Sequence, residues 1–120
     1  MPPSMHDELA SKKCLACEGG VPLLSQGDVL RLLHSLPGWT LSPHGHRIYR
    51  EWTCKHFMAA MEFLNRVAFL AEDEGHHPDM HLTGYRTVMM EVWTHAVGGL
   101  TENDFILAAK IDKVPIKLKD

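Results

Sequence analysis

The alternating run at residues 86–94 limits the possible folds of this chain more than any other stretch. Apolar and polar side chains alternate along it, which is typical of a β-strand with one covered face. The covered face would carry Val88, Met90 and Val92. The opposite face would carry Thr87, Met89, Glu91, Trp93 and His95. We therefore expect a sheet with its core on one side and a partly bare second side.

Six further segments around this strand have helical or extended patterns of their own. Helical spacing predicts helices at residues 25–36, 55–74 and 101–114, and alternation predicts strands at 39–42, 47–53 and 79–83. Ser25 and Thr101 each precede an acidic residue by three positions, the spacing of a capping box, and Gly75 suits the residue that closes a helix. The order α-β-β-α-β-β-α predicts an α+β fold: a four-stranded antiparallel sheet with three helices on one face.

The length of 120 residues fits one domain, which we expect at residues 25–114. Residues 1–24 show no sustained period, so we expect an N-terminal arm that is partly ordered at best. Residues 115–120 are expected to form a solvated tail. Within the arm, Cys14 and Cys17 have the CxxC spacing of half a zinc site or of a redox pair, but no second CxxC follows. We therefore favour a reduced, mobile segment there.

The predicted helix at residues 55–74 is apolar around much of its circumference. Its broad apolar face would carry Phe57, Ala60, Met61, Leu64, Val67, Ala68 and Ala71. Three more large apolar side chains flank the polar stripe of the same helix: Met58, Phe69 and Leu70. Two explanations stay open, a second buried face against a partner subunit or a wide core face wrapped by strands.

Charge and hydropathy argue against two kinds of partner. The net charge of −3, with no basic run beside aromatic residues, argues against nucleic acid. No run approaches the roughly 20 apolar residues of a membrane-spanning helix, and the N-terminus has no apolar stretch typical of a secretory signal. We therefore expect a cytoplasmic protein that binds neither nucleic acid nor a membrane.

Three of the nine histidines stand where side chains can border a cleft. His76 and His77 follow the predicted end of the long helix, and His95 follows the strand at residues 86–94. Imidazole exchanges protons near neutral pH, so this grouping favours proton-transfer chemistry. The alternative is that His76 and His77 only cap the helix, whose C-terminus favours a cation.

A metal site is a further alternative for the same histidines. Zinc would have to draw three ligands from His76, His77, His81 and His95. Adjacent residues of an extended stretch point to opposite sides, however, so both rarely reach one ion. The spacing also differs from the helical HExxH arrangement, in which two ligands share one face. We therefore expect no metal.

Several spaced motifs stand in the predicted element order: His76-His77-Pro78-Asp79, Trp93-Thr94-His95, Gly99-Leu100-Thr101 and Asp104. Together they resemble the pterin-4a-carbinolamine dehydratases, also called 4a-hydroxytetrahydrobiopterin dehydratases, and the similarity covers residues 25–112. The resemblance implies the same fold, homo-oligomers (sheet-edge dimers paired into tetramers through helices) and neither a metal nor an organic cofactor. The implied reaction removes water from a 4a-hydroxy-tetrahydropterin to give quinonoid dihydropterin, as in tetrahydrobiopterin recycling.

The resemblance also implies roles for individual residues. It places the catalytic histidines at His76, His77 and His95. It places the substrate contacts at Glu72, His76, His77, Pro78, Thr94, His95, Ala96, Val97 and Asp104, with Glu72 and Asp104 as supporting acids. From the chemistry of the reaction we expect His76 and His95 to form the acid–base pair and His77 to orient the substrate. Met80 departs from the family pattern, because animal members often have tryptophan there.

A different class of function stays open beside the enzyme. Animal members of the family double as a dimerisation cofactor of a homeodomain transcription factor. The same fold could therefore serve as a non-enzymatic binding module that dimerises with a protein partner through its exposed helix faces. A metal-dependent hydrolase is a third hypothesis, and it would require stoichiometric zinc.

Overall fold

The computed structural model describes residues 4–15 and 21–120 of the chain. Its elements are, in chain order, α1 (Met5–Ser11), α2 (Gln26–His34), β1 (Thr40–Leu41), β2 (Ile48–Thr53), α3 (Phe57–Glu74), β3 (Asp79–Thr83), β4 (Thr87–Val92), the 3₁₀ helix η1 (His95–Val97) and α4 (Glu102–Ile111). The α+β fold and the predicted order are confirmed, with α1 and η1 in addition. Among the described residues, no helix is long and apolar enough to cross a membrane.

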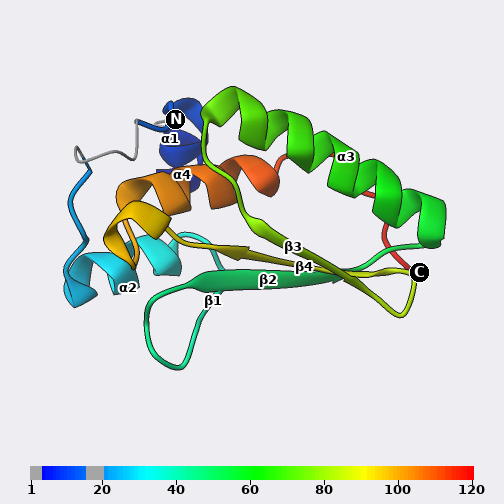
Figure 1. Cartoon of the computed structure of the whole chain (residues 1–120), viewed down its shortest axis with the longest axis horizontal. Coiled ribbons are helices and arrows are strands. Elements are labelled where there is room, and N and C mark those ends of the chain that lie inside the picture. Colours follow the sequence, from blue (N-terminus) through cyan, green and yellow to red (C-terminus); the bar gives the residue numbers. More distant parts are fainter. Residues whose placement is uncertain (1–3, 16–20) are drawn as a thin grey trace.

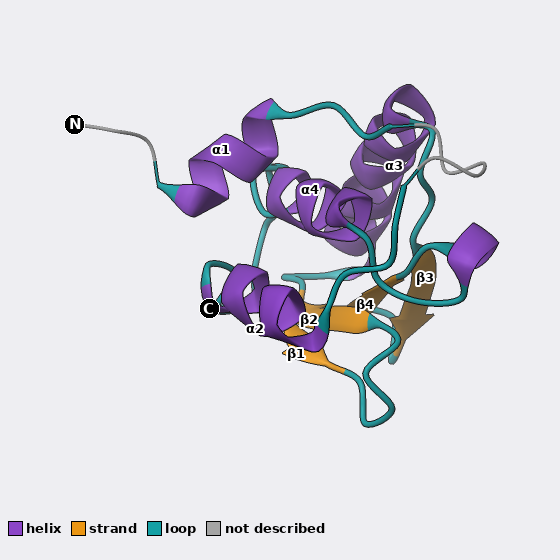
Figure 2. Ribbon diagram, turned by 90° about the vertical axis from the view of Figure 1, so that its left-hand side faces the viewer, coloured by secondary structure: helices purple, strands orange, loops and turns teal. Residues whose placement is uncertain are grey.

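The four strands form one antiparallel sheet in the order β1-β2-β4-β3. α3 and α4 lie over one face of this sheet (Figure 1). Figure 2 shows α1 beyond α4, and α2 near β1. Val88, Met90 and Val92 are fully buried, which confirms the predicted covered face of β4. The site residues that follow β4 therefore start from a strand fixed in the core.

Short-range signals at the helix ends act as the sequence predicts. The Ser25 hydroxyl accepts a hydrogen bond from the Asp28 N–H at 3.1 Å, and Thr101 and Asp104 form a capping box at the start of α4. Gly75 closes α3 with a φ of +66°. That left-handed conformation costs a residue with a Cβ about 1 kcal/mol, so glycine is favoured there. The turn at Gly75 leads the chain directly into residues 76–78.

The buried face of α3 differs from the predicted one. Its buried residues are Ala59, Ala60, Phe63, Val67, Ala71 and Glu74. Phe57 and Ala68, which were expected in the core, are exposed. Of the three flanking residues, Leu70 packs partly against the core, whereas Met58 and Phe69 are exposed. Because most positions of α3 are apolar, the sequence pattern does not indicate which face of the helix is buried. Packing against the sheet decides which face is covered.

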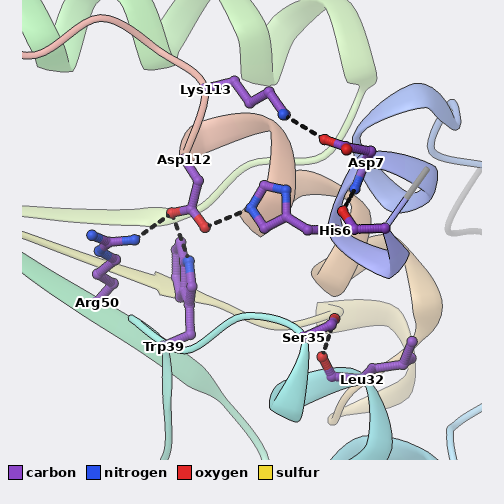
Figure 3. Close-up of polar contacts among 9 residues, drawn as sticks. His6, Asp7, Leu32, Ser35, Trp39, Arg50, Asp112 and Lys113 are labelled. Atoms are coloured by element: carbon purple, nitrogen blue, oxygen red, sulfur yellow. Dashed lines mark hydrogen bonds and ion pairs between the residues drawn. The ribbon is translucent and has the colours of Figure 1, made fainter. Parts of the chain in front are cut away.

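The N-terminal segment contains a helix where the sequence predicts an arm. α1 packs against α4 and buries Leu9, which is 1% exposed. Nε2 of His6 lies 3.0 Å from a carboxylate oxygen of Asp112, and Lys113 pairs with Asp7 at 2.8 Å (Figure 3). A seven-residue helix with one buried side chain is too short to show a period or to be stable alone. These tertiary contacts therefore hold α1 in place.

Asp112 also fixes the sheet to the end of α4. Its carboxylate accepts a hydrogen bond from Nε1 of Trp39 at 2.9 Å and pairs with the Arg50 guanidinium at 2.8 Å (Figure 3). Arg50 belongs to β2, and Trp39 directly precedes β1. One nearly buried carboxylate thus joins α1, α4 and two strands.

The C-terminal residues 117–120 are exposed, yet their backbone returns to the sheet. The Lys119 N–H donates to the Thr53 carbonyl at 3.0 Å, and the Lys55 N–H donates to the Lys117 carbonyl at 2.9 Å. Leu118 forms an isolated antiparallel bridge with Cys54. These backbone bonds extend the pairing beyond the end of β2.

Candidate active site

A pocket of about 230 Å³ lies between the end of α3 and η1. Its walls are formed by Gly75, His76, His77, Trp93, His95 and Ala96. The structure therefore brings the three histidines singled out in the sequence to one pocket, although His77 and His95 are 18 positions apart. The turn at Gly75 presents the first two, and the end of β4 presents the third.

His76 is held by a buried carboxylate. Its side chain is only 4% exposed, and its Nε2 lies 2.6 Å from Oδ1 of Asp104, which is fully buried. A carboxylate can only accept here, so Nε2 of His76 carries a proton in this pair. Such a partner fixes both the tautomer and the orientation of an imidazole. His76 is thus the most rigidly placed histidine of the pocket.

The second oxygen of Asp104 is fully occupied within the protein. Oδ2 accepts hydrogen bonds from the Thr94 hydroxyl at 2.9 Å and from the Thr101 N–H at 2.8 Å, and the two threonine hydroxyls lie 2.8 Å apart. The same carboxylate therefore caps α4 and holds His76. Thr94 and Asp104 are both fully buried, and neither side chain lines the pocket, so their roles as substrate contacts stay predictions.

His77 is held differently, at the open side of the pocket. Its Nε2 lies 2.7 Å from Oε1 of Glu72 in the last turn of α3, and both side chains are largely exposed. Glu72 does not line the pocket itself, and neither do Pro78 and Val97. Solvent screens an exposed ion pair, so Glu72 orients His77 weakly.

His95 follows β4 on the first turn of η1, with Ala96 beside it in the pocket wall. Its ring packs against Trp93, with ring centroids 4.1 Å apart. Trp93 also lines the pocket, yet it was not among the expected contact residues. The alternation of residues 86–94 placed Trp93 and His95 on one face, and this pattern could have identified Trp93 as a pocket residue.

Glu74, the last residue of α3, is held in place by hydrogen bonds directly before the turn at Gly75. Its carboxylate accepts a hydrogen bond from the Cys14 N–H at 2.9 Å and pairs with Nζ of Lys110 at 2.8 Å. Burial raises the pKa of Glu74, but the Lys110 and Cys14 donors and the charge of Lys110 outweigh it, so the pKa lies below its usual value. Asn103 exchanges two hydrogen bonds with the backbone of Leu15, at 2.9 and 2.7 Å. The N-terminal segment thus docks beside both halves of the buried histidine–carboxylate pair.

In residues 4–15 and 21–120, no group of three His, Cys, Asp or Glu side chains is arranged to hold a metal ion. His81, a possible fourth ligand in the sequence, instead pairs with Glu91 at 2.7 Å on the sheet. Cys14 is buried, with its Sγ 3.6 Å from the carbonyl oxygen of Asn103. Cys17 lies outside the described residues.

The sequence model of the pterin 4 alpha carbinolamine dehydratases matches residues 22–114, which is most of the chain. The chain belongs to this family. A pterin-4-alpha-carbinolamine dehydratase of Arabidopsis thaliana, a mitochondrial protein, is 43% identical over 113 residues. That match covers 92% of this chain, and the chain spans 60% of the length of the Arabidopsis protein. Family membership confirms the resemblance drawn from the histidine motifs.

Two further comparisons agree with this assignment to the dehydratase family. A relative from Rickettsia bellii, named for the same activity, is 47% identical over 105 residues, covering 87% of this chain and 91% of the relative. A crystal structure of a transcriptional coactivator/pterin dehydratase from Brucella melitensis superposes with a TM-score of 0.72 at 29% identity. It covers 77% of this chain and 97% of the Brucella chain.

Proposed function

We propose that the protein removes water from a 4a-hydroxy-tetrahydropterin to give quinonoid dihydropterin. The observation that carries the proposal is that His76, His77 and His95 line one pocket in a chain that belongs to the dehydratase family. The alternative role of His76 as a mere helix cap does not account for its contact with Asp104, a residue of another helix.

The reaction needs two proton transfers and no change of oxidation state. The C4a–O bond breaks, the proton on N5 leaves, and a C4a=N5 double bond forms as water departs. An imidazolium protonates the leaving hydroxyl, and a neutral imidazole accepts the N5 proton. Each transfer of this kind typically contributes roughly 10²–10⁴-fold to the rate.

The histidines divide this work according to their surroundings. We assign the acid–base pair to His76 and His95, which enter the pocket from different elements and so can face two atoms of a flat ring. His77, at the open side of the pocket, orients the substrate. Asp104 holds His76 from behind and Glu72 holds His77, so both acids act through a histidine.

The elimination requires neither a metal nor an organic cofactor in this proposal. Both protons can be carried by imidazoles, and no electrons are transferred. Turnover of the purified protein should therefore be unchanged after dialysis against a chelator. Stoichiometric zinc found by elemental analysis, together with loss of turnover on its removal, would support the metal-dependent alternative instead.

The direct test is an assay of 4a-hydroxy-tetrahydropterin dehydration with the wild type and His95→Ala. We expect turnover by the wild type and a loss of at least about tenfold in the variant, with an unchanged circular dichroism spectrum. His34→Ala is the control, because His34 is exposed on α2 and does not line the pocket. Wild-type rates in His95→Ala would end the catalytic assignment.

We also propose that copies of this chain associate through α3. Phe69 is 77% exposed and Met58 is 59% exposed on this helix, and large apolar side chains in such positions favour burial against a partner. Homo-oligomers through helices are what the family resemblance implies. A partner protein of another kind, as in a binding module, would use the same surface.

A cytoplasmic location remains part of the proposal. Cytoplasmic substrate would reach the pocket without transport of the protein across a membrane. The Arabidopsis relative is named as mitochondrial, so the alternative is an organelle. Fluorescence microscopy of the full chain with a C-terminal tag distinguishes a diffuse cytoplasmic signal from an organellar one.

A further inference from the structure

His95 differs from the other two histidines of the pocket in how it is held. His76 is bonded to Asp104, and His77 is bonded to Glu72. Within the part of the chain that the structure describes, no side chain forms a hydrogen bond with the ring of His95, which is exposed on the short helix η1. Acid–base catalysis requires a group held in a defined place, so something else must orient this ring.

The ring of His95 packs against the indole of Trp93. The ring centroids lie 4.1 Å apart with the planes tilted by 54°, well inside the range of attractive ring–ring contacts. Trp93 is half-buried and lines the same pocket. The proposed chemistry assigns no step to it.

Trp93 is itself clamped from two other elements. Its Nε1 donates a hydrogen bond to Oδ2 of Asp79 at 3.1 Å, and the Arg47 guanidinium carbon lies 4.5 Å from the indole centroid. Arg47 also pairs with Asp79 at 3.6 Å and with Glu91 at 3.4 Å, which fixes the cation over the ring. A cation over an indole contributes about 0.5–2 kcal/mol.

This clamp connects both sides of the pocket. Asp79 begins β3 directly after residues 76–78, whereas Trp93 directly follows β4 and lies two positions before His95. Arg47 comes from the turn before β2. The indole therefore contacts both the strand that follows residues 76–78 and the ring of His95.

We propose that Trp93, clamped by Arg47 and Asp79, is the positioning residue that orients His95 for proton transfer. This inference rests on the proposed dehydratase function. It assigns to an aromatic ring the role that carboxylates play for His76 and His77. Trp93 acts through His95, so its loss should lower kcat more than it changes KM.

The test compares kcat and KM of Trp93→Leu, Trp93→Phe and Arg47→Met in the full chain. We expect Trp93→Leu to lower kcat by about tenfold with KM within about threefold, because small displacements of a catalytic group are costly. Trp93→Phe keeps a ring against His95 and should recover kcat to within about threefold of the wild type. Arg47→Met should lower kcat by about threefold.

Arg50→Met is the matched control for Arg47→Met. Arg50 also lies over an indole, at 5.1 Å from the ring of Trp52, and also pairs with a carboxylate, but none of these residues lines the pocket. The folded Arg50→Met variant should dehydrate the pterin at the wild-type rate. Wild-type kcat in Trp93→Leu, or a change in KM alone, would overturn the positioning role.

An NMR measurement separates this inference from the proposed function. The Cε1–H resonance of His95, assigned by its absence in His95→Ala, should carry a ring-current shift in the wild type that disappears in Trp93→Leu. An identical resonance in both proteins would overturn the inference whether or not the wild type dehydrates a pterin. Absence of pterin turnover in the wild type, with the shift present, would overturn only the proposed reaction.

Discussion

The Nε2 of His76 and a carboxylate oxygen of Asp104 lie 2.6 Å apart in the interior of the protein. The two residues are 28 positions apart, one after the C-terminus of α3 and the other in the first turn of α4. Asp104 forms the capping box of α4 with its other oxygen. The start of one helix is thereby coupled to the histidine at the end of another, and the catalytic proposal depends on this coupling.

Asp104→Asn should lower kcat by about 10²-fold or more while leaving a folded protein. An asparagine can still accept from the Thr101 N–H through its oxygen, but its NH₂ group then faces His76. Nε2 of His76 would have to become an acceptor, which reverses the tautomer of the ring, and a reversed tautomer is costly in histidine–carboxylate pairs. Steady-state kinetics with a thermal unfolding curve check this expectation.

The matched control is Asp112→Asn, because the chain holds a second histidine–carboxylate pair outside the pocket. Nε2 of His6 lies 3.0 Å from Asp112 at the other end of α4. The control should lose stability and keep the wild-type kcat. Equal losses of kcat in both variants would show that Asp104 acts through stability alone.

Glu74→Gln should weaken the dependence of stability on acid. The pKa of Glu74 is lowered in the folded protein, so its stabilising contribution is present above the unfolded pKa of about 4.3 and is lost as the pH falls through the folded pKa. At pH 7 the variant should be less stable by about 2 kcal/mol, whereas at pH 3 the difference should shrink. Urea unfolding of the wild type and the variant at pH 7 and pH 3 measures the stability difference at each pH.

Asp73→Asn serves as the comparison for Glu74→Gln. Asp73 is the preceding residue on α3, and its carboxylate is exposed and 3.7 Å from Lys13. An exposed pair of this kind contributes about 0–1 kcal/mol, so this variant should unfold almost as the wild type does. A difference for Glu74→Gln that stays constant from pH 7 to pH 3 would contradict the role of its ionised form.

Asp112→Ala should lower the free energy of unfolding by about 2–4 kcal/mol at pH 7. The change leaves the indole N–H of Trp39 and the Arg50 guanidinium without their acceptor in a nearly buried place, and it releases α1 at His6. Lys113→Met removes only the exposed pair with Asp7, which solvent screens, and should cost much less stability than Asp112→Ala. Equal effects of the two changes would argue against Asp112 as the common anchor of these elements.

Phe69→Glu should shift the protein toward a smaller oligomer. The side chain is 77% exposed on α3, and a charge there is compatible with the isolated chain but not with an apolar interface between copies. Sedimentation velocity at several concentrations measures the change. Leu30→Glu, an equally drastic change at an exposed position of α2, should leave the oligomeric state unchanged. A wild type that is monomeric at every concentration would contradict association through α3.

Local sequence signals predicted most of the fold because they act over short distances. Ser25, Gly75 and the Thr101 capping box each fix a helix end through their own neighbours. α1 was not predicted, since a single buried leucine gives no period and its stability comes from Asp112 far along the chain. Ser4, whose hydroxyl accepts from the Asp7 N–H, was a capping signal that could have indicated it.

The site was predictable in its histidines but not in its supports. His76, His77 and His95 follow element ends, and that placement indicated a common cleft. The resemblance named Asp104 as a supporting acid, but only the packing of α4 shows that it is buried behind His76. The docking of Cys14 on Glu74 depends on long-range packing that no local pattern encodes.

The most direct test of the central claim is a double-mutant cycle on His76 and His95, measured as kcat/KM for dehydration of a 4a-hydroxy-tetrahydropterin. Two residues that act together on one substrate should give strongly non-additive losses. We expect His76→Ala and His95→Ala each to lose at least about tenfold, and the double variant to lose much less than the product of the two. Wild-type rates in either folded single variant, or losses that multiply fully in the double variant, would contradict an acid–base pair at this pocket.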